Sequence, residues 1–190
     1  TSLGAIAGRN IGSLFDPIRT TRMHSWHHAN GATFEHVGQR MRAWYYPREG
    51  EDFQQTINRE VHATRHYAGL LDASTLGKID VKGPDSAEFL NRVYTNNFAT
   101  LPIGKSRYGL MLKEDGMVFD DGVTTRLAED HFYMTTTSGG AAGVLAWLEE
   151  LLQTEWQDLN VYLTSVTEQW SVASLSGPNA KTILKACMSE

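Results

Sequence analysis

The segment from residue 108 to residue 127 predicts two β-strands joined by a tight turn. Tyr108-Gly109-Leu110-Met111-Leu112 and Met117-Val118-Phe119 have the composition of strands, and the second run continues through residues 120–127. Between them, Lys113-Glu114-Asp115-Gly116 has the Asp-Gly pair that is typical of hairpin turns. Strands joined by so short a connection are antiparallel, so the chain is expected to build an antiparallel sheet.

Further elements follow from periodicity and from turn residues. Strands are predicted at residues 77–82, 131–137, 161–167 and 170–175, and helices at residues 24–31, 52–68, 86–94 and 141–152. Residues 43–47 read as extended. Gly83-Pro84 and Gly177-Pro178 each stand between a predicted strand and a predicted helix, with apolar residues six and seven positions after the glycine. This weak repeat favours two related α+β units. The predicted fold class is α+β, with antiparallel sheets and helices on one side.

Composition and charge exclude several classes of protein. The chain has 190 residues, 41% of them hydrophobic, which fits one globular domain or slightly more. Residues 49–190 carry eleven basic and twenty acidic side chains, which argues against nucleic-acid binding. Residues 1–48 carry six arginines and two acids, which could form a docking arm or, as charge runs usually do, a solvated surface.

The same sequence gives expectations about compartment and chain boundaries. No apolar run reaches the ~18 residues that cross a bilayer. Residues 1–8 lack the basic start of a signal peptide, and a single cysteine excludes an internal disulfide, so a cytoplasmic protein is expected. Residues 1–23 read as irregular or extended, and the chain stops inside a predicted helix. A fragment of a longer polypeptide is therefore expected.

Asp120-Asp121 is the pair of residues that most suggests chemistry. Both acids lie within a predicted strand, where acids are rare. Successive strand residues face opposite sides, and alternation with Phe119 and Val123 predicts that Asp121 points into the fold. An inward carboxylate suits the binding of an amine or the transfer of one proton. The alternative is a β-bulge at Gly122 that leaves both acids in solvent.

Other motifs carry less weight. His24 with His28, and His62 with His66, have the i,i+4 spacing of metal ligands on a helix, but neither pair has an obvious third ligand, so no metal site is predicted. No Walker motif occurs and no G-x-G-x-x-G run follows a strand, so no dinucleotide-binding unit is expected in this segment. Ser138-Gly139-Gly140 could bind an anion before a helix, although a plain turn is favoured.

Several motifs together resemble a known family, the folate-binding aminomethyltransferases, whose type member is the T-protein of the glycine cleavage system. The resemblance lies in residues 74–85, Tyr94-Thr95-Asn96, Leu101-Pro102-x-Gly104-Lys105, Tyr108 and residues 116–121. It covers roughly residues 22–190, without the family's C-terminal domains. Within the family, residues 72–80 and 113–127 are most similar to the α subunit of heterotetrameric sarcosine oxidases, and residues 3–8 resemble its link to an N-terminal NAD-binding region. Asp80 and Thr125 differ from the T-protein.

The resemblance implies domains and a reaction. Residues 1–22 would be a linker from a preceding region, and residues 23–190 an incomplete, T-protein-like folate-binding domain truncated at its C-terminus. In such complexes sarcosine is oxidised at a flavin on the β subunit, and the imine is converted with tetrahydrofolate into 5,10-methylenetetrahydrofolate and glycine. FAD, FMN and NAD are expected elsewhere in the complex, and this segment alone is expected to be inactive. The expected partners are the other subunits, especially the flavin-bearing β subunit, with no membrane and no nucleic acid.

The resemblance also implies site residues. The second Asp of the family's Asp-Asp motif is catalytic and falls on Asp121. The expected folate-binding residues are Leu76, Tyr108, Asp121, Val123 and Thr137. Two alternatives remain open: a stand-alone folate-dependent aminomethyltransferase or demethylase, and a non-catalytic scaffold of the same family.

Overall fold

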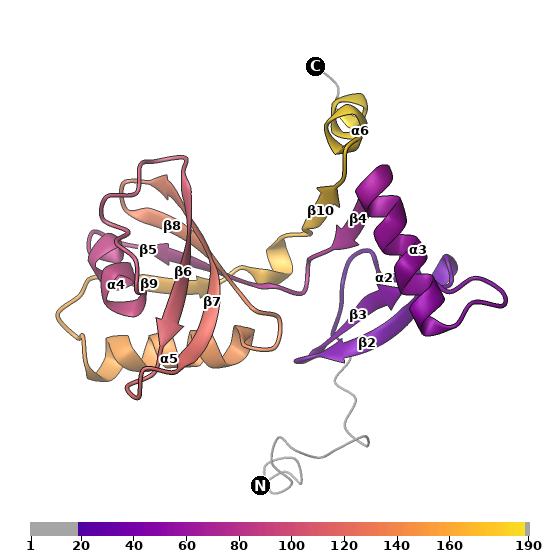
Figure 1. Cartoon of the computed structure of the whole chain (residues 1–190). Helices are drawn as coiled ribbons and strands as arrows, with labels where there is room; N and C mark the ends of the chain where they lie inside the picture. The colour runs from indigo at the N-terminus through magenta and orange to yellow at the C-terminus, as the bar shows by residue number, and fades with distance from the viewer. Residues whose placement is uncertain (1–18, 189–190) are drawn as a thin grey trace, which may run out of the picture.

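The computed structural model describes residues 19–188, which form two lobes joined by two short connections (Figure 1). We call residues 77–166 the sheet lobe, and residues 19–72 together with 170–188 the small lobe. Most of the expected linker, residues 1–22, lies outside the described residues. Two chain segments connect the lobes, one before residue 77 and one after residue 166, so the small lobe is built from both ends of the described chain.

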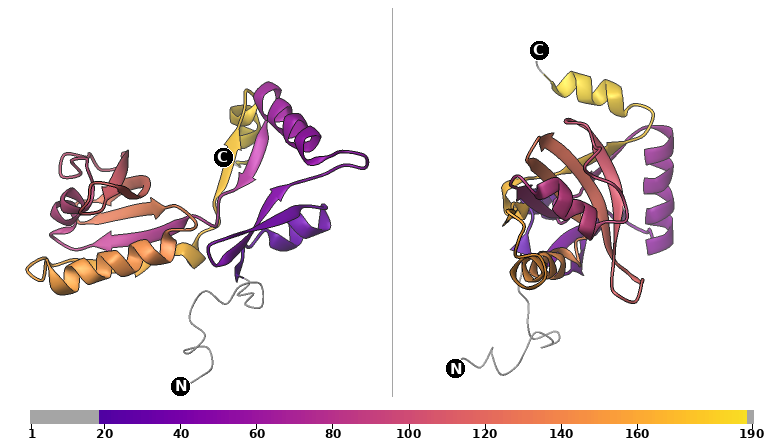
Figure 2. Two further views of the ribbon diagram at one scale, coloured as in Figure 1. Left: turned by 60° about the horizontal axis from the view of Figure 1, so that its bottom comes forward. Right: turned by 90° about the vertical axis from the view of Figure 1, so that its left-hand side faces the viewer.

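The sheet lobe contains one antiparallel sheet of five strands in the order β6-β7-β8-β5-β9. The strands are β5 (Gly77–Lys82), β6 (Ser106–Leu112), β7 (Val118–Ala128), β8 (His131–Thr136) and β9 (Tyr162–Ser165). Helices α4 (Ser86–Val93) and α5 (Ala141–Thr154) pack on one face, and Figure 2 shows α5 lying along the sheet. This arrangement confirms the predicted α+β class with antiparallel strands and helices on one side.

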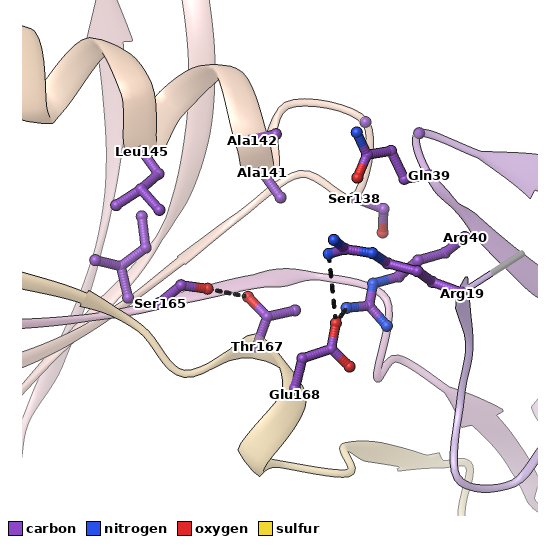
Figure 3. A pocket seen from close by; sticks show the side chains of 13 residues that line it. Arg19, Gln39, Arg40, Ser138, Ala141, Ala142, Leu145, Ser165, Thr167 and Glu168 are labelled. Atoms are coloured by element: carbon purple, nitrogen blue, oxygen red, sulfur yellow. Dashed lines mark hydrogen bonds and ion pairs between the residues drawn. The ribbon is translucent and has the colours of Figure 1, made fainter. Parts of the chain in front are cut away.

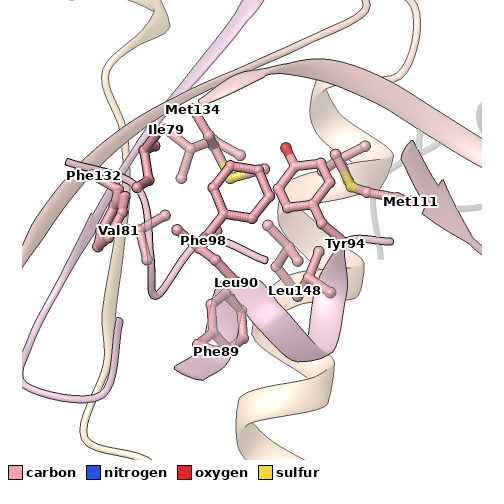
Figure 4. Packing of buried hydrophobic residues seen from close by; sticks show 13 residues of the cluster. Ile79, Val81, Phe89, Leu90, Tyr94, Phe98, Met111, Phe132, Met134 and Leu148 are labelled. Atoms are coloured by element: carbon pink, nitrogen blue, oxygen red, sulfur yellow. The ribbon is translucent and has the colours of Figure 1, made fainter. Parts of the chain in front are cut away.

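The hydrophobic core lies between this face and the two helices (Figure 4). Phe89 and Leu90 of α4 and Leu148 of α5 are fully buried, and Phe132 and Met134 meet them from β8. Each such side chain stabilises the fold by about 1.5–3 kcal/mol when it leaves water. The opposite face of the sheet carries no α-helix within residues 19–188, and exposed side chains lie on it at β6 and β7.

The predicted hairpin between β6 and β7 is confirmed. The Lys113 amide donates to the Met117 carbonyl at 2.9 Å, and the Gly116 amide donates to the Lys113 carbonyl at 2.9 Å. Gly116 has φ 80°, a left-handed conformation that glycine adopts without strain. One irregularity follows the turn. Met111 lies opposite Asp120 and Leu112 lies opposite Val118, so Phe119 is an extra residue, a β-bulge in β7.

The small lobe contains two small sheets, in the orders β1-β3-β2 and β10-β4. Its elements are β1 (Arg19–Thr20), α2 (His24–Ala29), β2 (Thr33–Val37), β3 (Arg40–Tyr45), α3 (Phe53–His66), β4 (Gly69–Asp72), β10 (Ala173–Ser176) and α6 (Ala180–Cys187). Helix α3 begins with a capping box, in which Asp52 accepts from the Gln55 amide at 2.8 Å and Gln55 accepts from the Asp52 amide.

The predicted elements differ from the structure at two places in this region. The sequence does not predict the strand β2, because its residues Thr33–Val37 follow the helix end at Gly31 without clear alternation. The strands predicted at 161–167 and 170–175 are shorter, since a 3-10 helix, η2 (Thr167–Gln169), separates β9 from β10. This turn redirects the chain from the sheet lobe back to the small lobe.

Both predicted Gly-Pro corners connect a strand to a helix. Gly83 has φ 126° and Gly177 has φ 108°. A Cβ on Gly83 would lie 2.2 Å from the Asn160 carbonyl oxygen, and one on Gly177 would lie 2.4 Å from the Thr64 carbonyl oxygen. Only glycine satisfies both the left-handed backbone and the close approach at these corners. Among residues 19–188, no helix is long and apolar enough to cross a membrane.

Candidate functional site

The two adjacent acids of β7 face opposite sides of the sheet, in the reverse of the predicted orientation. Asp120 is buried, with 4% of its surface exposed, and lies on the helix-covered side with Met111 and Thr124. Asp121 is half-buried and lies on the face without helices. The prediction that Asp121 points into the core is therefore wrong, and so is the alternative that leaves both acids in solvent.

The cause is the bulge at Phe119. An extra residue in a strand shifts the alternation of every residue on one side of it. Phe119 is half-buried against Trp147 of α5, with ring centroids 5.0 Å apart, and Asp120 is buried next to it. Counting alternation from Phe119 therefore gives the wrong face for Asp121. The bulge lies two residues before Asp121, whereas the sequence suggested it at Gly122.

Three of the expected site residues meet on the open face of the sheet. Tyr108 is paired with Val123 across β6 and β7, and the next pair on that face is Leu110 with Asp121. Tyr108 is 55% exposed and Val123 is 42% exposed. Partial burial and a hydrogen bond to the Asp121 carboxylate raise the pKa of the Tyr108 hydroxyl. An aromatic ring, an apolar side chain and a carboxylate thus share one accessible surface.

The regular pairing of strands β7 and β8 ends next to Asp121, although the two strands stay in contact there. Their regular pairing begins at Thr124 opposite Met134, and before it the Thr135 side chain bridges the gap. Its Oγ1 accepts from the Val123 amide at 3.0 Å and donates to the Val123 carbonyl at 3.0 Å. A Cβ on Gly122 would lie 1.8 Å from the Thr135 carbonyl oxygen. Gly122 therefore allows the close contact that holds Asp121 at this position.

Leu76 and Thr137 lie in two adjoining loops at one end of the sheet. Leu76 is half-buried in the turn before β5, and Thr137 is exposed directly after β8. Thr75 and Ser138, the neighbours of these two residues, share a hydrogen bond of 2.8 Å between their hydroxyls. The Thr137 amide donates to the Asp120 carboxylate at 3.3 Å. This contact connects the loop of Thr137 to the residue that precedes Asp121.

Lys78 supports the loop of Leu76, a role that sequence reasoning missed. Its side chain is fully buried, and its Nζ donates to the carbonyls of Ser74 at 2.9 Å and Leu76 at 2.8 Å. Burial and the nearby charge of Arg40 lower the pKa of the Lys78 ammonium. In the sequence Lys78 is one polar residue of an alternating strand, so nothing there indicates that it is buried.

A pocket of about 430 Å³ lies between the lobes, apart from the open face (Figure 3). Arg19 and Arg40 of the small lobe both reach the carboxylate of Glu168 in η2, Arg19 at 3.7 Å. The N-terminal end of α5 borders the pocket at Ala141, but Glu168 already supplies an anion to both guanidiniums. The expected site residues do not line this pocket, whose ion pairs hold η2 against the small lobe.

The described residues give no cluster of metal ligands. Among residues 19–188, no group of three or more His, Cys, Asp or Glu side chains is placed to hold a metal ion. The rings of His62 and His66 stack on the exposed surface of α3 with centroids 4.0 Å apart.

Comparison with known proteins gives a consistent family. The family model described as the GCVT N-terminal domain matches residues 23–190. The sarcosine oxidase α subunit of Corynebacterium sp. (strain P-1) is 58% identical over 183 residues, which is 96% of this chain and 19% of that subunit. The sarcosine oxidase α subunit of Rhizobium meliloti is 47% identical over 190 residues, which is 100% of this chain and 19% of that subunit.

More distant relatives extend the comparison. An aminomethyltransferase of Corynebacterium aurimucosum is 34% identical over 162 residues, which is 85% of this chain and 40% of that enzyme. The crystal structure of glycine cleavage system aminomethyltransferase T from Bartonella henselae superposes with a TM-score of 0.77 at 29% identity, over 90% of this chain and 44% of that one. The chain thus spans about a fifth of the sarcosine oxidase subunits and less than half of the aminomethyltransferases.

Proposed function

The chain belongs to the GCVT N-terminal domain family, and from this premise we propose that it is the tetrahydrofolate-binding part of a sarcosine oxidase α subunit. Its identity to the α subunits is 58% and 47%, against 34% to an aminomethyltransferase. The chain covers only 19% of those subunits, so the proposal concerns a part of a larger complex. It works there with the flavin-bearing β subunit and other subunits, in the cytoplasm, and is inactive alone. FAD, FMN and NAD belong to other parts of that complex.

The residues of the open face fit a flat heteroaromatic ligand that carries amines. The exposed ring of Tyr108 offers an aromatic surface, and Val123 offers apolar contact beside it. The carboxylate of Asp121 offers acceptors for N–H groups on the same face. Leu76 and Thr137 would contribute an apolar and a polar contact from the loops at the end of the sheet.

Tetrahydrofolate, when bound, supplies the amines that accept the one-carbon unit of the imine, which yields 5,10-methylenetetrahydrofolate and glycine. The Asp121 carboxylate would orient the reacting amine and stabilise positive charge that develops beside it. The Tyr108 hydroxyl, whose pKa is raised by partial burial and by the Asp121 carboxylate beside it, would donate to that carboxylate and help to orient it.

The observation that carries the proposal is the placement of Asp121, Tyr108 and Val123 on one accessible face. The test is Asp121→Ala in the purified, intact complex. Sarcosine should still reduce the flavin, whereas the yield of 5,10-methylenetetrahydrofolate should fall and free formaldehyde should rise. Asp130→Ala removes an exposed carboxylate from the turn after β7 and serves as the matched control. An unchanged methylenetetrahydrofolate yield in the Asp121 variant would refute its assignment.

Two other functions would give different results. A stand-alone aminomethyltransferase or demethylase would form methylenetetrahydrofolate from a methylamine donor without a flavoprotein partner. A non-catalytic scaffold would show no tetrahydrofolate binding by calorimetry, even in the complete subunit.

A further inference from the structure

Asp120 is a buried carboxylate without a cationic partner. Its exposed fraction is 4%, and within residues 19–188 no basic side chain forms an ion pair with it. Burying a charge is costly unless hydrogen bonds or a local field compensate for it. A neutral or apolar residue at this position on the core side of β7 would avoid that cost. The hydrogen bonds of this carboxylate and the elements beside it show how the fold accommodates it.

One oxygen of Asp120 joins the two segments that carry expected site residues. Oδ1 accepts a hydrogen bond from the amide of Asp121 at 2.8 Å and another from the amide of Thr137 at 3.3 Å. The first bond fixes the backbone of Asp121 at the point where β7 leaves the bulge. The second holds the loop after β8 against β7, where the regular pairing of the two strands has already ended.

The other oxygen faces the beginning of α5. Oδ2 is buried without a hydrogen-bond partner among the described residues, and a Cβ on Gly140 would lie only 2.4 Å from it. Gly140 is the N-cap residue of α5, a helix of 14 residues with no acidic side chain in its first turn and no side-chain cap. Oδ2 of Asp120 therefore lies at the beginning of α5, the end of a helix whose dipole favours a negative group.

We propose that Asp120 is a positioning residue, which acts through Asp121 and Thr137 and itself touches no ligand. Its carboxylate, held against the first turn of α5, fixes both backbone segments so that the Asp121 side chain stays on the open face beside Tyr108. This inference rests on the proposed function, because positioning has meaning only if Asp121 acts on bound tetrahydrofolate.

The test compares three variants of the intact complex. Asp120→Ala removes both acceptors, whereas Asp120→Asn retains one oxygen for the two amides. Thr124→Val is the matched control, since Thr124 is fully buried on the same face of β7, four residues after Asp120, and its hydroxyl donates to the Tyr94 hydroxyl at 3.3 Å. The readouts are hydrogen exchange at the amides of residues 121 and 137, and the kinetics of methylenetetrahydrofolate formation.

Asp120→Ala should speed exchange at both amides and lower kcat about tenfold or more, as expected when a reacting group is misplaced, with KM for tetrahydrofolate within about twofold. Asp120→Asn should keep the exchange at both amides and kcat close to the values of the unmodified complex. Thr124→Val should change neither the amide exchange nor kcat. Equal effects of Asp120→Ala and Thr124→Val on kcat would overturn the inference. If Asp120→Ala does not fold, a lowered kcat in Asp120→Asn with unchanged exchange at both amides would overturn it as well, because the rate would then not depend on the backbone positions that Asp120 holds.

The two failures are distinguishable. If the proposed function is wrong, the unmodified complex forms no methylenetetrahydrofolate, although the amides of residues 121 and 137 are protected. If only the present inference is wrong, the unmodified complex forms the product and Asp120→Ala forms it at the same rate.

Discussion

Gly122→Ala is the substitution for which the structure gives the sharpest consequence. A Cβ at this position would lie 1.8 Å from the carbonyl oxygen of Thr135 and 2.8 Å from its carbonyl carbon, whereas ordinary contacts begin at 3.4 Å. Both atoms are backbone, so no side chain can rotate away. Strands β7 and β8 would have to separate by about 1.6 Å at this point. Such overpacking costs about 1–3 kcal/mol of stability.

The same separation moves the neighbouring Asp121. A displacement of about 1 Å can lower the rate of a positioned reaction by about a hundredfold. The assay is urea unfolding of the intact protein together with its yield of methylenetetrahydrofolate. Gly143→Ala is the matched control, because a Cβ there meets nothing within 4 Å and alanine favours a helix interior by about 0.8–1 kcal/mol. A Gly122→Ala protein as stable and as active as the unmodified one would refute this account of β7.

Three further predictions concern stability. Leu148→Ala should lower the free energy of unfolding by about 2–5 kcal/mol, because this fully buried side chain fills the space between α5 and the sheet, and a loss below 1 kcal/mol in urea titration would contradict the assigned core. Lys78→Met should lower it by about 1–3 kcal/mol, since the Ser74 and Leu76 carbonyls lose their buried donor, and unchanged thermal unfolding would argue against that role. Burial raises the pKa of Asp72, but hydrogen bonds from neighbours including Ser74 lower this pKa by more than burial raises it, so the net shift is downward. The Asp72 carboxylate therefore stabilises the folded protein above about pH 4, and this stabilisation is lost as the pH falls through the lowered pKa of Asp72. Asp72→Asn should weaken the dependence of the free energy of unfolding on pH in this range, as measured by unfolding at a series of acidic pH values.

Local signals in the sequence are sufficient to predict most of the strands and helices of the sheet lobe. The Asp-Gly turn, the alternation of β5 and the apolar face of α5 each depend on neighbouring residues, and the structure confirms these elements. The Gly-Pro corners were also recognisable, because glycine at a left-handed position before proline is a local requirement. In the small lobe the chain is shaped by pairing between distant segments, such as β4 with β10, and β2 gave no clear local signal.

The orientation of the Asp-Asp pair shows where alternation fails. Alternate residues lie on the same face of a strand only where the strand pairs without a bulge. The extra residue Phe119 interrupts this pairing. At the bulge, Phe119 packs against Trp147, a contact between residues 28 positions apart in sequence that local alternation does not reveal. The grouping of Tyr108, Val123 and Asp121 on one face follows from the strand register. The resemblance to the family implied that these residues share a site, but the pattern of residues alone did not establish it.

The most direct test of the central claim is calorimetric titration of tetrahydrofolate into the intact protein and two tyrosine variants. Tyr108 and Tyr162 lie on the same face of the sheet, 55% and 66% exposed, but on opposite edge strands, β6 and β9. Tyr108→Ala should weaken binding about tenfold, which corresponds to about 1.4 kcal/mol of lost aromatic contact. Tyr162→Ala should leave the dissociation constant within about twofold. Equal effects of the two substitutions, or none from Tyr108→Ala, would contradict the assignment of this face as the folate site.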